Sequence, residues 1–74
     1  MSSSQFITIN NDEIINISNI VSIKKVMYYG TPRIRIFISD GTKLHDIFIE
    51  CNDDEKEQNE QFERLQTLLN AQKL

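Results

Sequence analysis

The chain has 74 residues, of which 39% are hydrophobic and 26% are charged, and its formal net charge is −3. This length fits a single domain spanning residues 1–74, and the hydrophobic fraction is too high for a disordered chain. No stretch approaches the roughly 20 apolar residues of a membrane span, and the acidic balance disfavours general binding to phosphate backbones.

Two short runs rich in β-branched residues open the chain. Residues 6–9 (FITI) precede Asn-Asn-Asp at 10–12, which favours a turn, and residues 14–17 (IINI) follow. These runs predict a hairpin. A third run, residues 20–27, comes after Ser-Asn at 18–19, and it is either a separate strand or the second run continued beyond a bulge.

The strongest pattern is the alternation of residues 33–38 (RIRIFI), followed by an Asp-Gly pair and a second run at 44–49 (LHDIFI). Asp-Gly is favoured in two-residue hairpin loops. Such a loop pairs Ile36 with His45 and Arg35 with Asp46, because directly opposed residues share a face. The isoleucine side is then the expected core, and the opposite side carries two phenylalanines, a leucine and a cross-strand ion pair.

The period of the pattern becomes helical after Asn52. Asn52 and Glu55 have the spacing of a capping box, and acidic residues crowd the following turns, where the helix dipole favours them. The apolar stripe of the helix consists of Phe62, Leu65, Leu68 and Leu69. Residues 53–61 contain no apolar side chain, so this part is either the start of the helix or a loop before a shorter one.

These elements predict an α+β fold. We expect a small antiparallel sheet of four to five strands, built from hairpins within about residues 5–50, and one C-terminal helix within about 53–72 that packs on one face. The predicted core consists of Ile7, Ile9, Ile15, Ile17, Ile23, Ile34, Ile36, Ile38, Ile47, Ile49, Phe62, Leu65 and Leu69.

The residues needed for catalysis or metal binding are scarce. The single histidine, His45, and the single cysteine, Cys51, lie about 20 Å apart along one extended strand at ~3.3 Å per residue, so they cannot form a catalytic pair there. One His and one Cys exclude the ordinary zinc-finger ligand sets within one chain, and the two glycines fit no phosphate-binding loop. We therefore expect no enzyme, no catalytic residue, no metal, no cofactor and no small-molecule substrate.

Residue usage bears on compartment and origin. The first five residues show neither the basic nor the apolar region of a secretory signal, and one cysteine cannot form an internal disulfide. We expect a cytoplasmic protein. Twelve isoleucines and seven asparagines are typical of AT-rich coding DNA, which indicates a bacterial or phage origin.

The second face of the sheet suggests a function. One short helix cannot cover both faces, and contiguous exposed apolar surface usually marks an interface. A non-catalytic protein–protein interaction module is therefore expected, either a homodimer or a small regulator or inhibitor of another protein. The expected interface residues are Phe37, Leu44, Phe48, Arg33 and Arg35.

An alternative is a sheet-surface binder of single-stranded nucleic acid. Basic groups interleaved with aromatic rings serve this function, because the charges bind phosphates and the rings stack on bases. The residues in question are Lys24, Lys25, Tyr28, Tyr29, Arg33 and Arg35. A second form of the protein-binding hypothesis uses the acidic segment to dock on a basic surface, through Glu50, Asp53, Asp54, Glu55, Glu57, Glu60 and Glu63.

Overall fold

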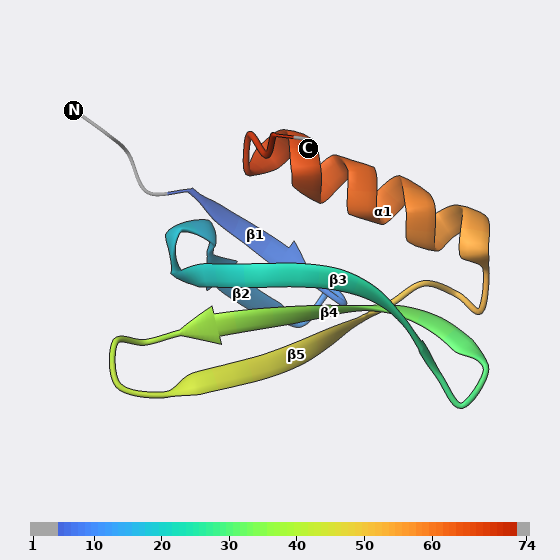
Figure 1. Ribbon diagram of the computed structural model, residues 1–74, viewed down its shortest axis with the longest axis horizontal. Helices are drawn as coiled ribbons and strands as arrows, with labels where there is room; N and C mark the ends of the chain where they lie inside the picture. Colours follow the sequence, from blue (N-terminus) through green and yellow to red (C-terminus); the bar gives the residue numbers. More distant parts are fainter. Residues whose placement is uncertain (1–4, 73–74) are drawn as a thin grey trace.

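The computed structural model describes residues 5–72 and has the α+β organisation, with antiparallel strands followed by one C-terminal helix (Figure 1). Its elements in chain order are β1 (Phe6–Ile9), β2 (Glu13–Asn16), a 3-10 turn η1 (Ile17–Asn19), β3 (Ile20–Tyr28), β4 (Thr31–Ser39), β5 (Leu44–Glu50) and α1 (Glu55–Leu68). No helix in this part of the chain is both long enough and apolar enough to cross a membrane.

The strands form two sheets, so the expectation of one sheet of four to five strands is wrong. β1 and β2 make a two-stranded sheet, and β3, β4 and β5 make a three-stranded sheet with β4 in the centre. The break lies at η1, where the Asn16 side chain accepts hydrogen bonds from the Ser18 backbone N–H at 3.0 Å and from its hydroxyl at 2.9 Å. This local bonding replaces the extended backbone with a tight turn, which makes β2 and β3 separate strands.

The β1–β2 hairpin and α1 cover the same face of the three-stranded sheet (Figure 1). The buried cluster between them consists of Ile9, Ile15, Ile34, Ile36, Ile49, Cys51 and Leu65. Side chains that are partly buried against it are Ile7, Ile20, Ile23, Ile38, Ile47 and Phe62. Among residues 5–72, no element packs on the opposite face of the three-stranded sheet.

Most of the predicted core residues belong to this cluster, and two do not. Ile17 and Leu69 are half-buried and lie outside it. Cys51 and Gln58 are buried although the hydrophobic pattern did not include them. Both lie beyond the last strand, where neither strand nor helix periodicity indicates which side chains point inward.

The β4–β5 pairing differs by two residues from the predicted register. Ile36 pairs with Ile47 and Arg35 with Phe48, and the loop has four residues instead of two. The Asp40 carboxylate is the cause, because it accepts hydrogen bonds from the backbone N–H of Thr42 at 2.9 Å and of Lys43 at 2.8 Å. A shift of two residues leaves every side chain on its predicted face.

Helix α1 begins after Asp54, so the capping role predicted for Asn52 is wrong. The Asp54 side chain accepts a hydrogen bond from the Lys56 N–H at 2.9 Å, whereas Asn52 and Asp53 have left-handed φ values of 53° and 54°. The polar residues 55–61 are therefore helical. Gln58 attaches this half of the helix to the sheet, because its Nε2 donates to the carbonyl oxygens of Val26 and Arg33.

Candidate interaction surface

The uncovered face of β3–β4–β5 gathers most of the residues singled out from the sequence. We call it the outer face, and it consists of Ser22, Lys24, Val26, Tyr28, Arg33, Arg35, Phe37, Asp46, Phe48 and Glu50. Strand pairing arranges these side chains in rows across the sheet. Lys24, Arg35 and Phe48 form one row, and Val26, Arg33 and Glu50 form another.

Cations lie close to aromatic rings on the outer face. The Arg35 guanidinium carbon lies 4.6 Å from the centroid of the Phe37 ring and 5.8 Å from that of Phe48. The Lys24 ammonium lies 5.9 Å from the Phe37 centroid. The Arg33 guanidinium carbon lies 5.1 Å from the ring of Tyr28, within the range of cation–π attraction.

Two carboxylates complete the charge pattern of this face. Arg35 binds Asp46 twice, with Nη2 at 2.6 Å and Nε at 2.8 Å from the same Oδ2 atom. The predicted Arg35–Asp46 ion pair is thus present, although the two residues are diagonal rather than directly opposed. Arg33 lies 3.7 Å from Glu50, and its buried Nε has no partner within the described residues.

The two predicted sets of binding residues largely coincide on the outer face. Arg33, Arg35, Phe37 and Phe48 lie together there, and Leu44 lies at the start of β5 with an exposed fraction of 62%. From the nucleic-acid set, Lys24 and Tyr28 join them.

Two residues of the nucleic-acid set are placed elsewhere. Lys25 faces the helix, where its Nζ donates to Asn59 Oδ1 at 3.0 Å and lies 5.3 Å from the Phe62 centroid. Strand alternation separates Lys25 from Lys24, because neighbouring side chains point to opposite faces. Tyr29 lies in the β3–β4 turn, 90% exposed, with its ring edge against Tyr28 at a centroid distance of 4.5 Å.

The histidine and the cysteine occupy different environments. Cys51 is buried, and burial raises the pKa of its thiol, with the charges of Glu57 and Glu50 adding to the effect. A protonated, buried thiol is a weak nucleophile. His45 is exposed on β5, with Nε2 at 3.3 Å from Asp40 Oδ2. No group of three potential metal ligands occurs within residues 5–72.

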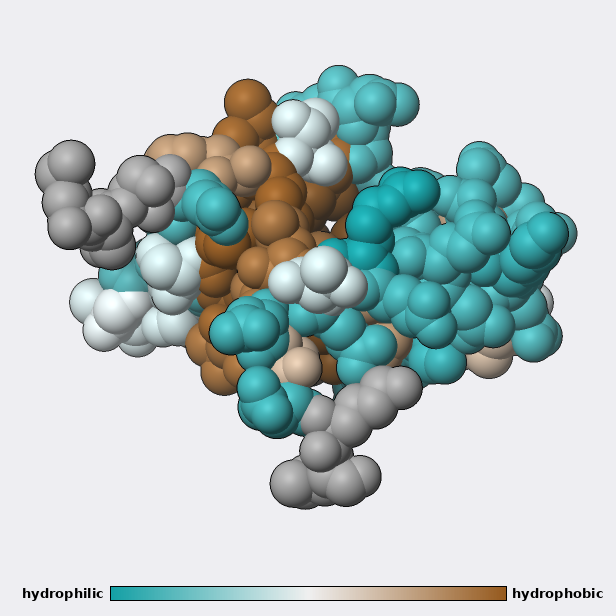
Figure 2. Space-filling model, turned by 90° about the horizontal axis from the view of Figure 1, so that it is seen from above, coloured by the Kyte–Doolittle hydropathy of each residue, from teal (hydrophilic) through white to brown (hydrophobic). Residues whose placement is uncertain are grey.

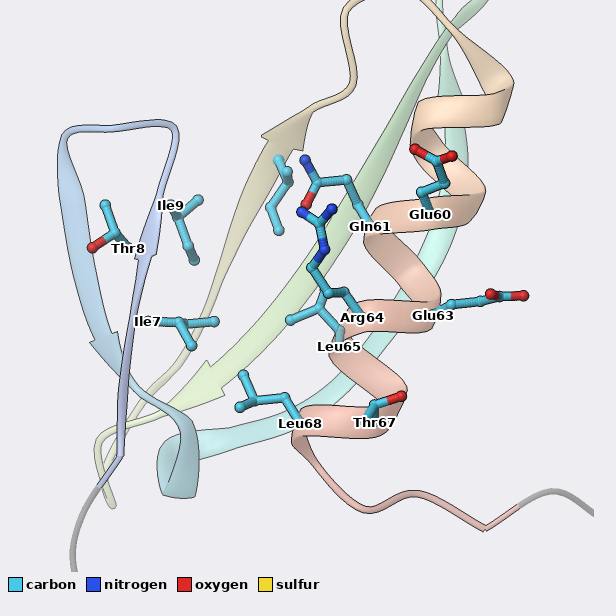
Figure 3. Close-up of a pocket in the computed structure, with 11 residues that line it drawn as sticks. Ile7, Thr8, Ile9, Glu60, Gln61, Glu63, Arg64, Leu65, Thr67 and Leu68 are labelled. Atoms are coloured by element: carbon cyan, nitrogen blue, oxygen red, sulfur yellow. The ribbon is translucent and has the colours of Figure 1, made fainter.

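A groove between β1 and α1 escaped the sequence analysis. It has a volume of about 810 Å³. Ile7 and Ile9 point into it from the hairpin, and Leu65 and Leu68 come from the helix (Figure 3). Figure 2, which looks onto the side of the molecule where α1 lies, shows a band of hydrophobic surface between hydrophilic areas. The sequence predicts the apolar stripe of the helix. How much of this stripe stays uncovered depends on the distance between the hairpin and the helix.

Comparisons with protein families, curated proteins and solved structures find no match to this chain. A proposal of function therefore depends on the surfaces themselves. The outer face offers aromatic rings with charges of both signs, and the groove offers aliphatic side chains.

Proposed function

We propose that this chain is a non-catalytic interaction module that binds a second copy of itself through the outer face. The observation that carries the proposal is a sheet face with no covering element among residues 5–72, on which Phe37 and Phe48 lie half-buried beside the Arg35 guanidinium. A 74-residue chain also buries little of its surface, about 60% for a domain of this size, so association adds core that one copy lacks.

The charge pattern supports a copy of the same chain as the partner. A two-fold interface brings the same surface of each subunit together, so it must be complementary to itself. The outer face carries the cations Lys24, Arg33 and Arg35 beside the carboxylates of Asp46 and Glu50. Rotation by 180° about an axis through this face can oppose cations of one copy to carboxylates of the other, while the central rings meet.

The test is the solution mass, measured by light scattering on a size-exclusion column. We expect the wild type to have twice the 8.7 kDa mass of the chain, and Phe37→Asp to have the mass of one chain. Leu44→Asp at the margin of the face should weaken the dimer without affecting the core. Phe6→Asp, at an exposed phenylalanine of the hairpin, is the matched control and should leave the dimer intact.

Circular dichroism distinguishes dissociation from unfolding. The proposal requires that Phe37→Asp keeps the wild-type spectrum while it dissociates. A wild type that is monomeric at high concentration, or a dimer that survives both Phe37→Asp and Leu44→Asp, contradicts the proposal.

Binding of single-stranded nucleic acid is the second candidate. The observation in its favour is that Lys24, Arg33 and Arg35 lie over aromatic rings on the same face, next to the exposed rings of Tyr28 and Tyr29. Bound bases could stack on these tyrosines while the cations bind phosphates.

Fluorescence anisotropy with labelled oligo-dT and oligo-rU at low salt tests this second candidate. Its affinity should fall steeply as salt is added, because phosphate contacts release counterions. Lys24→Glu and Tyr28→Ala should abolish binding, whereas Lys25→Glu, on the other side of the sheet, should weaken it less. Absence of binding at low salt excludes this function.

A further inference from the structure

The β1–β2 hairpin is attached to the rest of the domain by few contacts. Within residues 5–72, its hydrogen bonds with β3, β4, β5 and α1 are the two that the Asn10 side chain makes with β5. Ile9 and Ile15 are buried in the core, and Ile7 packs partly against it. Release of the hairpin from the core therefore breaks two hydrogen bonds and exposes three isoleucines.

The connection from this hairpin to β3 is the 3-10 turn η1, which we call the hinge. The Asn16 Oδ1 atom closes the hinge by accepting hydrogen bonds from the N–H and the hydroxyl of Ser18. The Ile20 N–H donates to the Ile17 carbonyl oxygen across the same turn. The chain reverses direction here, so that the hairpin folds back onto the sheet (Figure 1). An extended hinge would carry the hairpin away from the core of its own chain.

The residues of the hinge and its flanks also fit an extended strand. Asn16 and Ile20 already have extended backbone angles, with φ and ψ of −86° and 120° at the first and −76° and 126° at the second. Ile17 lies in the turn although a β-branched residue favours strands. A change of conformation in the three hinge residues thus makes β2 and β3 one continuous strand, and these three residues then span about 10 Å.

We propose that two copies of this chain exchange their β1–β2 hairpins, so that each hairpin packs on the core of the other copy. The partner is a second copy because the site that one hairpin uncovers is already complementary to an identical hairpin. The exchanged dimer keeps the isoleucine contacts and the Asn10 bonds, and it differs from two monomers at the two hinges. It does not use the outer face, because the hairpin lies on the opposite side of the three-stranded sheet.

The test compares full-length protein unfolded in urea and refolded at low and at high protein concentration. We expect refolding at high concentration to give a dimer that persists after dilution, because its dissociation requires both hairpins to detach from the cores that they cover. Light scattering on a size-exclusion column measures the mass. The Phe37→Asp background removes the dimer proposed for the outer face, so a dimer of this variant must form elsewhere.

Substitutions of Asn16 test the role of the hinge in this background. Asn16→Val removes the acceptor that closes the turn and introduces a residue that favours strands. The association constant of the dimer should therefore rise at least about tenfold, which corresponds to about 1.4 kcal/mol over the two hinges. Asn16→Asp is the matched control, because it keeps a side-chain acceptor at the same position, and it should leave the association constant close to that of Asn16.

Isotope-filtered NOE spectra locate the hairpin in the wild-type dimer and do not depend on the folding of Phe37→Asp. The dimer is refolded from a mixture of ¹³C-labelled and unlabelled chains. We expect contacts between methyl groups of Ile9 or Ile15 of one chain and those of Ile34 or Ile36 of the other, because these residues share one buried cluster. A dimer formed through the outer face has these contacts within each chain only.

Three results would overturn the proposal. The first is that the wild type, Phe37→Asp and the variant that also carries Asn16→Val all stay monomeric after refolding at high concentration. The second is a wild-type dimer whose filtered spectra contain no hairpin contacts between chains. The third is an equal rise in association for Asn16→Asp and Asn16→Val, which would exclude the closed hinge as the barrier to exchange. The second result leaves the outer-face dimer standing, so failure of this proposal is distinguishable from failure of the proposed function.

Discussion

The side chain of Asn10 takes the place of a neighbouring strand at the free edge of β5. It lies in the turn after β1 with a left-handed φ of 55°, a conformation that asparagine tolerates better than most residues. Its Nδ2 donates to the Phe48 carbonyl oxygen at 2.9 Å, and its Oδ1 accepts from the Glu50 N–H at 3.0 Å. One side-chain amide therefore makes the pair of hydrogen bonds that a neighbouring strand would make with the edge of β5, and it attaches the hairpin to the three-stranded sheet.

Replacement of Asn10 by glycine should separate this role from the backbone conformation. Glycine keeps the left-handed φ without strain but loses both hydrogen bonds, so we expect a loss of about 1–2 kcal/mol in the free energy of unfolding. For a domain of this size that corresponds to a fall in Tm of several degrees, about 4–8 °C per kcal/mol. The measurement is thermal unfolding by circular dichroism.

Asn11 supplies the control for this change. Its φ is 63°, and its side chain makes no hydrogen bond within residues 5–72, so Asn11→Gly should leave Tm close to the wild-type value. Equal effects of the two glycine substitutions would show that Asn10 does not attach the hairpin through its amide.

The Asp40 carboxylate is the second residue on which local structure depends. Backbone hydrogen bonds from Thr42 and Lys43, followed by bonds from the Thr42 hydroxyl and His45, hold the pKa of this carboxyl well below its ordinary range. A carboxyl with a lowered pKa in the folded state stabilises the protein above its unfolded pKa, and the benefit disappears as the pH falls.

The stability of the wild type relative to Asp40→Asn should therefore depend on pH. We expect the wild type to have the higher Tm near neutral pH, because its charged acceptor binds the loop more strongly than an amide oxygen does. The difference should shrink below about pH 4, where the unfolded chain takes up the proton first. Melting curves of both proteins across this range give the result, and a constant difference would contradict it.

The same loop shows what the sequence could predict at this scale. Asp-Gly correctly indicates a hairpin between the two alternating runs, but it does not distinguish a two-residue loop from a four-residue one. The length of the loop depends on the Asp40 carboxylate and on the hydroxyl and backbone N–H donors that follow it in the chain. Because the register shift is even, Ile36 and Phe37 still point to the faces that alternation assigned to them.

The helix depends on one buried polar residue. Gln58 is only 6% exposed, and its Nε2 lies 3.0 Å from the Val26 oxygen and 2.9 Å from the Arg33 oxygen. The amide group thus fixes the first half of α1 over the β3–β4 pair, where residues 55–61 of the helix supply no apolar side chain. Hydrophobic periodicity treats glutamine as a solvent-facing residue, so it could not predict that Gln58 is buried against the sheet. The sequence therefore leaves open whether residues 53–61 form a helix or a loop.

Gln58→Glu should lower the free energy of unfolding much more than the near-identical shapes of the two side chains suggest. It places a carboxylate against two carbonyl oxygens, so we expect a loss of about 2 kcal/mol or more at neutral pH. Burial raises the pKa of such a carboxyl in the folded state, so the loss should diminish as the pH falls and the protonated group donates again. Urea unfolding near neutral pH and near pH 5 gives the two values.

Gln58→Leu is the comparison for this substitution. It keeps the bulk of the side chain and loses the hydrogen bonds without introducing a charge, so its cost should be smaller, and independent of pH. A glutamate variant as stable as the leucine variant at neutral pH would show that Gln58 is not held against the two carbonyl oxygens.

At the scale of the whole molecule, the sequence predicts which strands and which helix form better than it predicts how they pack together. Alternation correctly separates the isoleucine face from the face with Arg35 and Phe37, since the period of a strand is a local property. The division into two sheets and the groove beside Leu68 depend on where the hairpin packs. That placement is decided by long-range contacts such as those of Asn10 with β5, which no local pattern contains.

The two-sheet arrangement leaves β3 as a long edge strand. Among residues 5–72 it pairs only with β4, so its other edge has no neighbouring strand along its nine residues. Exposed edges of this length invite pairing with another chain, and charged side chains often prevent it. Lys24 lies at the midpoint of β3, so antiparallel pairing of two β3 edges about this point would oppose one Lys24 to another.

Lys24→Val should therefore create an association that the wild type avoids. The change removes the repulsion and introduces a β-branched residue that favours strands, so we expect species with a larger mass than the wild type, whose proportion rises with concentration. Light scattering on a size-exclusion column measures this mass. Lys24→Arg keeps the charge and should behave as the wild type, because repulsion across the edge is preserved. If Lys24→Val also keeps the wild-type mass at all concentrations, then the edge is protected by something other than this lysine. The register shift between Ile20 and Ser22 is one other feature of β3 that disfavours regular pairing.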